Sequence, residues 1–199
     1  MYPWEHAAVA YLLYAGYTRW RTGTAPAGWA VLVVLFASQL PDLLDKPLAW
    51  QFALIPSGRS LAHSVFVAVP LALVVLAVAR RHEATPLGVA FTIGSLSHLA
   101  TDAVSLYPGG STSPATVLWP LVSYESATDA AASDSTAAAQ TGDILLGAYP
   151  SLVALEPTGE VLVRLGIVGM AGLVWVHDGR PGVRELTCVL RWAIAVMAR

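Results

Sequence analysis

Five apolar stretches, each close in length to a membrane-spanning helix, occupy most of this 199-residue chain. A helix needs about 20 mostly apolar residues to cross the hydrocarbon core of a bilayer, where it must satisfy its own backbone hydrogen bonds. The chain is 56% hydrophobic and 12% charged, whereas soluble domains carry about 25% charged residues. The sequence therefore predicts a membrane protein. Hydropathy places the five stretches at 4–20, 26–44, 60–79, 86–106 and 161–177.

The predicted fold is all-α: a polytopic membrane bundle of about five transmembrane helices with an interfacial C-terminal helix. Two further apolar segments, 144–155 and 186–199, are too short to span a bilayer, so we expect them to be interfacial or re-entrant. The second is amphipathic and basic, which is typical of a helix that lies on a membrane surface.

The segment between the fourth and fifth stretches differs in composition from the rest of the chain. Residues 123–143 are rich in Ser, Thr, Ala and Asp and lack hydrophobic periodicity, so we expect a flexible acidic loop. The chain then divides into a membrane-embedded part (1–122) that holds the candidate site, this loop, and a C-terminal membrane helix with its tail (144–199). The first and last parts are expected to belong to one bundle.

Basic residues are unevenly distributed between the connections. If every stretch crosses the membrane, the connections after the first, third and fifth share one side. They carry Arg19, Arg21, Arg80, Arg81, Arg180, Arg184, Arg191 and Arg199. The loop 107–160 on the other side has acidic residues but no Lys or Arg. The positive-inside rule therefore predicts a cell-membrane protein with its N-terminus outside and its C-terminus in the cytoplasm.

Charge and cysteine content narrow the range of partners. The net charge is -2 and no basic patch stands out, which argues against a nucleic-acid partner. Membrane lipids are the expected partners. The single cysteine, Cys188, excludes an internal disulfide, and a bound metal would have to be held by His and carboxylate side chains.

Imidazole and carboxylate side chains gather at the predicted outer ends of four stretches. They are His6 on the first stretch, Asp42 and Asp45 at the end of the second, His63 at the start of the third, and His98 and Asp102 near the end of the fourth. His98 and Asp102 are one helical turn apart, and so are Arg59 and His63, which predicts that each pair shares a helical face. Ionisable residues within a membrane span are costly and are usually functional.

We interpret His6, Asp42, Asp45, His63, His98 and Asp102 as candidate ligands of a divalent metal. Imidazoles with carboxylates suit zinc, or else manganese or iron, better than magnesium or calcium. Six ligands exceed the need of one tetrahedral zinc, so one ion with open positions and two neighbouring ions both fit. The alternative interpretation is a buried salt-bridge network without a metal.

Other polar residues near this cluster have candidate roles. Arg59 is expected to neutralise charge on a phosphate, since its planar guanidinium suits that task. One carboxylate is expected to act as a general base instead of a ligand: Asp45, another of the aspartates, or Glu5. A second set of residues either supports the ligands or only packs helices: Ser38, Gln39, Thr92, Ser95 and Ser97. His82 and His177, in the arginine-bearing connections, are assigned no role.

Five motifs of the chain occur in an order known from one protein family. The N-terminal His6, LPDLLD, GRSLAHS, SHLATD and LWP (118–120) together resemble the YdjM-like family of membrane-bound metal-dependent hydrolases, over about residues 1–122. The family motif before the third stretch commonly reads His-Arg-Gly-x-Thr-His-Ser. Here Gly58, Ser60 and Ala62 replace its first, third and fifth residues. The resemblance therefore implies a variant site that lacks one potential ligand or acid/base.

The resemblance also implies an activity. The family is similar, distantly, to zinc-dependent phospholipase C and P1 nuclease, which implies hydrolysis of a phosphoester. A metal would lower the pKa of a bound water toward about 7 and polarise the phosphoryl oxygen. At the outer membrane surface, a lipid head group is the natural substrate. The alternative is a non-enzymatic membrane protein with a structural metal site or an ion-binding cluster, whose coordination would be closed to water.

Overall fold

The computed structural model describes residues 2–104, 114–122 and 159–197, and every regular element within these ranges is helical. The prediction of an all-α fold is confirmed for these ranges. The expected acidic loop 123–143 and the apolar segment 144–155 lie outside them. The helices are α1 (Pro3–Thr22), α2 (Gly28–Ala37), α3 (Leu40–Trp50), α4 (Val65–Arg81), α5 (Thr85–Ala103), the 3-10 helix η1 (Pro114–Val117), α9 (Gly159–His177) and α10 (Val183–Met197).

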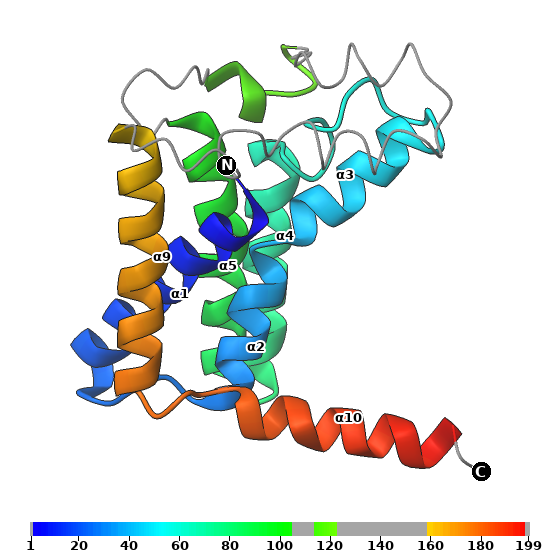
Figure 1. The fold of residues 1–199 in the computed structure, drawn as a ribbon. Helices are drawn as coiled ribbons and strands as arrows, with labels where there is room; N and C mark the ends of the chain where they lie inside the picture. The colour runs from blue at the N-terminus through cyan, green and yellow to red at the C-terminus, as the bar shows by residue number, and fades with distance from the viewer. Residues whose placement is uncertain (1, 105–113, 123–158, 198–199) are drawn as a thin grey trace.

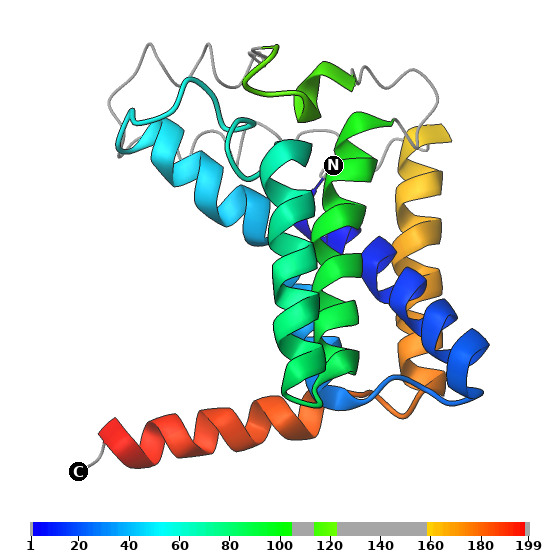
Figure 2. The ribbon, with the colours of Figure 1, turned by 180° about the vertical axis from the view of Figure 1, so that it is seen from behind.

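The helices form a bundle with one helix across its end. Figure 1 and Figure 2 show α2, α4, α5 and α9 running along a common direction, with α1 crossing them obliquely. By length and composition, one helical stretch of the described residues can cross a membrane, namely 28–50, which comprises α2 and α3. Val161–His177 is apolar but shorter. Each of the five predicted stretches contains a helix, and five crossings remain a prediction.

The second stretch, predicted as one continuous helix, is divided into α2 and α3, which meet at an angle (Figure 1). Pro41 has no backbone N–H, so the carbonyl of Ala37 lacks the helical donor four residues later. The Ser38 hydroxyl donates to the carbonyl of Leu35 at 2.7 Å and completes the end of α2. Asp42 consequently lies in the first turn of α3, where the helix dipole favours its charge, and not at a helix C-terminus.

The third helix begins later than predicted. Ser64 caps α4, with its hydroxyl accepting from the Phe66 N–H at 3.2 Å, so the helix begins at Val65. Arg59 and His63 precede this helix in a non-helical segment. The prediction that they share a helical face is therefore wrong. Ser60 donates through its hydroxyl to the Ser57 carbonyl at 2.9 Å. Such local side-chain bonds compete with helix formation.

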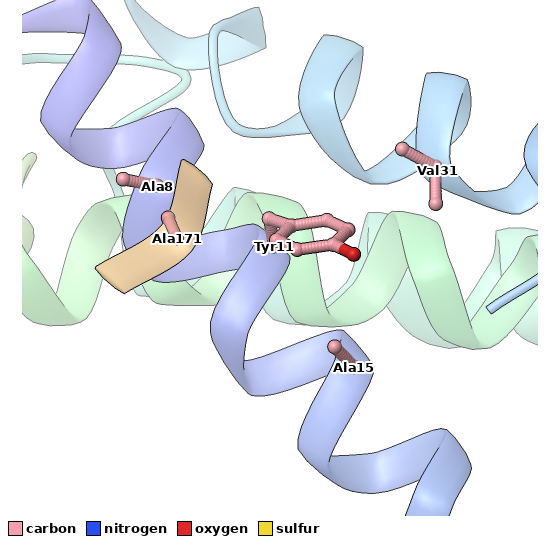
Figure 3. Close-up of a cluster of buried hydrophobic side chains, with 5 residues drawn as sticks. All are labelled: Ala8, Tyr11, Ala15, Val31 and Ala171. Atoms are coloured by element: carbon pink, nitrogen blue, oxygen red, sulfur yellow. The ribbon is translucent and has the colours of Figure 1, made fainter. Parts of the chain in front are cut away.

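Small side chains form the contact between α1 and its neighbours. Figure 3 shows Ala8, Tyr11 and Ala15 of α1 close to Val31 of α2 and Ala171 of α9, and these five residues make one buried cluster. Small residues allow membrane helices to approach closely, which increases van der Waals contact. This contact fixes α1 beside α2 and α9, and it thereby fixes the position of the residues at the start of α1.

Helix α5 packs against α1, α2 and α4 and approaches α2 most closely at Gly94. A Cβ atom at this position would lie 2.5 Å from the Val34 carbonyl oxygen and 2.8 Å from the Ala37 Cβ. Glycine is therefore required where the two helices touch. One turn later on α5, His98 reaches the residue that ends α2.

Gly94→Ala is expected to lower the free energy of unfolding by about 1–3 kcal/mol, because the added methyl group overpacks the α2–α5 contact. Gly166→Ala on α9 is the matched control, since a Cβ there meets nothing within 4 Å. It should be neutral or stabilise by up to about 1 kcal/mol through helix propensity. Unfolding in detergent measures both. Equal effects of the two substitutions would contradict the close contact at Gly94.

Candidate metal centre

Five ionisable side chains converge at the end of the bundle where α5 ends and α4 begins. They are His6 (α1), Asp42 (α3), His63 (before α4), and His98 and Asp102 (α5). The Nε2 atoms of His63 and His98 are 3.2 Å apart. Asp42 Oδ1 lies 3.5 Å from the first and 3.8 Å from the second of these atoms. The structure thus brings together five of the six candidate ligands.

His6 joins the cluster from the other side of His98. Its ring stacks on the His98 ring with centroids 3.8 Å apart, and its Nε2 lies 3.5 Å from Asp102 Oδ1. Asp102 Oδ2 is 3.7 Å from the Nε2 atom of His63. The three imidazoles are buried. The cluster is therefore an interior feature of the bundle and not a set of surface charges.

Each imidazole is held through its Nδ1 atom. His98 Nδ1 lies 2.6 Å from the Ser38 carbonyl oxygen, and His63 Nδ1 lies 2.9 Å from Asp45 Oδ2. His6 Nδ1 lies 2.9 Å from the Thr101 hydroxyl, which itself donates to backbone carbonyls of α5. Carbonyl and carboxylate oxygens only accept, so Nδ1 carries the hydrogen in His63 and His98. It does so in His6 as well when the Thr101 hydroxyl donates to the α5 backbone.

A neutral imidazole with its hydrogen on Nδ1 presents a lone pair at Nε2. Histidines that bind metals are held in this way, with the other ring nitrogen donating to a protein acceptor. Two such lone pairs face each other at 3.2 Å between His63 and His98. This arrangement is favourable only when a cation, either a proton or a metal ion, is shared among the facing atoms.

The carboxylates make this region attractive to cations. Burial alone would lower the pKa of His63, which precedes α4. Hydrogen bonds to Asp42 and Asp45, together with the charge of Asp102, outweigh burial and raise its pKa above the ordinary value. The electrostatic environment of His63 therefore favours a positive charge.

The spacing of the side chains fits a metal ion. Ligands at about 2.1 Å from a tetrahedral ion are roughly 3.4 Å from one another. The candidate ligands form two groups that share His98: His6 with His98 and Asp102, and Asp42 with His63 and His98. The distances from His63 Nε2 to His98 Nε2 and from His98 Nε2 to Asp102 Oδ2 are 3.2 and 4.0 Å, and within each group of ligands all facing atoms lie within 4.8 Å of one another. This donor set fits one ion or two neighbouring ions.

Asp45, the sixth predicted ligand and a predicted general base, does not face the common centre. Its side chain is fully buried, and Oδ1 accepts from the Ala62 N–H at 2.8 Å. Oδ2 accepts from the N–H groups of Ser60 and His63 at 2.9 and 3.1 Å, and from the His63 ring. In the structure, Asp45 therefore supports His63 and shapes the segment before α4.

Two cations lie at the rim of the cluster. Arg59 donates through Nε to Asp102 Oδ2 at 2.9 Å, and Lys46 donates to Asp42 Oδ2 at 2.6 Å. Their side chains are 28% and 34% exposed, whereas the carboxylates that they contact are largely buried. The sequence predicts Arg59 near the site, whereas it assigns Lys46 no role there. Its i,i+4 spacing from Asp42 was the available signal.

Glu5, considered from the sequence as a base, is held by other partners. It is buried and accepts from the Tyr2 N–H at 2.8 Å and from Arg164 Nη1 at 3.0 Å. Arg164 belongs to α9 and also lies over the Tyr2 ring. The sequence pattern assigns Arg164 no role. In the structure it joins α9 to α1 beside His6.

The polar residues predicted to support the ligands divide into two groups. Ser38 does so through its backbone carbonyl, and Gln39 connects the end of α2 to the Pro3 carbonyl at 3.0 Å. The other three predicted residues, Thr92, Ser95 and Ser97, donate through their hydroxyls to carbonyls of α5 itself. They therefore do not support the ligands directly. Thr101, the partner of His6, was missed, although it lies three residues after His98 on the same helix.

The remaining histidines lie at the other end of the bundle. His82 follows the last turn of α4, and His177 is the last residue of α9. His63 precedes the first turn of α4, so the whole length of this helix separates it from His82.

Comparison with known proteins gives one match. A family model described as YdjM inner membrane protein matches residues 1–179 of the chain. No curated protein and no solved structure matches the chain. The matched residues include every member of the cluster and the whole of α1 to α9, and they end before α10.

Asp45→Ala is expected to lower the free energy of unfolding by about 3 kcal/mol or more. It leaves the N–H groups of Ser60, Ala62 and His63 without this acceptor. Ser60 and His63 are buried, where each such group costs about 1–3 kcal/mol. Asp42→Ala is the matched control. It removes a carboxylate whose nearest partner, Lys46, is partly exposed and which otherwise faces His63 and His98, so its loss should cost less than that of Asp45. Unfolding in detergent with a chelator present compares the two, and similar losses would contradict the supporting role of Asp45.

Proposed function

The chain belongs to the YdjM inner membrane protein family, and from this premise we propose that it is a membrane-bound, divalent-metal-dependent hydrolase of phosphoesters. The observation that carries the proposal is the convergence of three Nε2 lone pairs with the carboxylates of Asp42 and Asp102. Each ring is oriented by a separate acceptor at Nδ1. This is the arrangement that a protein uses to hold a metal ion.

We assign the ligand role to five residues: His6, Asp42, His63, His98 and Asp102. Their nitrogen and oxygen donors suit zinc, or else manganese or iron. When bound, the ion supplies Lewis acidity and lowers the pKa of a water molecule. The protein orients the ligands: Asp45, Thr101 and the Ser38 carbonyl hold the three imidazole rings in place, and the surrounding helices bury them.

The cations at the rim support a phosphoester as substrate. Arg59 and Lys46 are partly exposed next to Asp102 and Asp42, so a phosphate that enters from the rim meets positive charge first. The planar guanidinium of Arg59 can bind two phosphate oxygens, and the Lys46 ammonium acts as a point charge. Both stay protonated, so their role is to bind the anion and to stabilise charge that develops on it.

Topology supports a lipid head group as the phosphoester. We propose that α1, the α2–α3 stretch, α4, α5 and α9 cross the membrane, with the cluster at the outer surface. Arginines follow the ends of α1, α4 and α9 that are remote from the cluster, as the positive-inside rule requires of the cytoplasmic side. Arg164, near the cluster, is neutralised by Glu5. The site then lies at the depth of the outer head groups.

A second candidate function is a structural metal site without catalysis. Burial favours it, because the side chains of His63 and His98 are 0% exposed and that of Asp102 is 3% exposed. A structural site is coordinatively closed, whereas a catalytic site keeps a position for water. X-ray absorption of the metal-loaded protein counts the ligands, and a complete shell of protein atoms with no oxygen from water favours the structural role.

His98→Ala is expected to abolish metal binding, because both groups of ligands share this residue. Metal analysis of protein purified in detergent, after incubation with zinc, measures the content per chain. His82→Ala is the matched control and should retain the full content, since His82 lies beyond the far end of α4. Full metal content in the His98→Ala protein would overturn the proposed site.

Hydrolysis is tested separately with phospholipid vesicles and with a soluble phosphomonoester. The metal-loaded protein should release product, and Arg59→Gln should lower kcat/KM by about tenfold to a hundredfold while metal content is unchanged, because Arg59 binds the substrate and not the ion. Bound metal without turnover of any phosphoester would favour the structural alternative.

The orientation predicts the accessibility of thiols in intact cells. Cys188 on α10 should not react with a membrane-impermeant thiol reagent, because the arginine-rich end faces the cytoplasm. Gln51→Cys, in a Cys188→Ser background, should react, because Gln51 is exposed at the cluster end. Reaction of the thiol at 188 but not of the thiol at 51 would contradict the proposed orientation.

A further inference from the structure

Helix α10 has two chemically different faces, neither of which is buried by the protein. With 3.6 residues per turn, one face is an apolar stripe formed by Leu186, Leu190, Ala193 and Met197. Leu190 is 52% exposed and Met197 is 79% exposed. Arg184 and Arg191, seven residues apart, lie together on the opposite face. Trp192 lies between the two faces.

The direction of α10 is set by the turn that precedes it. Gly179, Arg180 and Gly182 have left-handed backbone conformations, with φ of +80°, +58° and +95°. Trp175 Nε1 donates to the Pro181 carbonyl at 3.0 Å, which holds the turn against the end of α9. The chain therefore leaves α9 through a defined turn and not through an open linker.

The first turn of α10 also contacts α2. A Cβ at Gly182 would lie 3.2 Å from Leu32 Cδ2, and the Glu185 carboxylate lies against Gly28. Beyond this contact α10 extends away from the bundle. Figure 1 and Figure 2 both show it lying across the bundle end, roughly perpendicular to α2, α4, α5 and α9. If those helices cross a membrane, α10 runs parallel to the membrane surface.

The same end of the bundle is rich in arginine. Arg21 is in the last turn of α1, Arg80 and Arg81 are in the last turn of α4, and Arg180 is in the turn after α9. Arg184 extends this basic region onto α10, with a side chain that is 89% exposed. If the bundle crosses a membrane, the apolar stripe and the basic face of α10 lie at the level where the hydrocarbon and head groups of the bilayer meet.

We propose that α10 lies in the membrane interface, with its apolar stripe among the acyl chains and with Arg184 and Arg191 bound to anionic phospholipid head groups. An amphipathic helix with basic residues on its polar face binds membranes in this way. A lipid surface fits better than a second copy of the chain, because a bilayer that surrounds the bundle necessarily reaches α10. The inference does not depend on the chemistry of the metal centre.

The test uses the full chain in vesicles of phosphatidylcholine, with and without phosphatidylglycerol. A fluorophore is attached either to the natural Cys188, toward the polar face, or to Leu190→Cys in a Cys188→Ser background. The label at 190 should be quenched by lipid-borne nitroxide and protected from aqueous iodide, and the label at 188 should show the reverse.

Anionic lipid should strengthen this difference. Arg184→Gln and Arg191→Gln should each lower the ratio of membrane-bound to water-exposed α10 by about fivefold, since a basic residue near an anionic surface contributes about 1 kcal/mol. Thr187→Gln is the control on the polar face and should leave the ratio unchanged.

Three results would overturn the proposal. Quenching of the label at 190 by iodide in both lipid compositions would place α10 in water. Protection of the label at 190 from both quenchers, with disulfide cross-linking of two unlabelled Leu190→Cys chains in the Cys188→Ser background, would show that a second copy covers the stripe. Equal quenching with and without phosphatidylglycerol would exclude recognition of anionic head groups.

Discussion

The need to give every buried imidazole an acceptor for its Nδ1 hydrogen is the constraint on which the cluster end of the bundle depends. Each acceptor comes from a different part of the chain: the Ser38 carbonyl ends α2, the Asp45 carboxylate lies on α3, and the Thr101 hydroxyl lies on α5. Removing one acceptor would leave a polar group buried without a partner, which is costly in a low-dielectric interior. The rings are therefore held by the same contacts that hold the helix ends together.

The break between α2 and α3 serves this constraint twice. Because Pro41 cannot donate to Ala37, the backbone leaves its helical path there, and the Ser38 carbonyl becomes available to His98. The new direction of α3 then carries Asp42 to the cluster and Asp45 to the segment before α4. Gly94 permits the close approach of α5 that brings His98 to this point. A proline and a glycine thus determine where the ligating atoms meet.

The two ends of the molecule have opposite electrostatic character. The cluster end holds carboxylates and imidazoles, and the cations near it are paired with acids: Lys46 with Asp42, Arg59 with Asp102, Arg164 with Glu5. The far end carries exposed arginines and the basic face of α10. In a membrane protein this separation sets the orientation, because arginines are retained on the cytoplasmic side. It also separates the proposed chemistry at one end of the bundle from the proposed lipid binding at the other.

The sequence by itself determined the membrane family, the helical class and five residues of the cluster, because hydropathy and helical periodicity place His6, Asp42, His63, His98 and Asp102 near the same ends of their stretches. Only the tertiary structure decided the supporting contacts. The roles of Asp45, Thr101 and Arg164 depend on pairing between segments far apart in the chain, and Asp45 meets its partners because residues 57–63 form turns instead of a helix. Periodicity describes one element at a time, whereas hydrogen bonds between elements depend on how all of them pack.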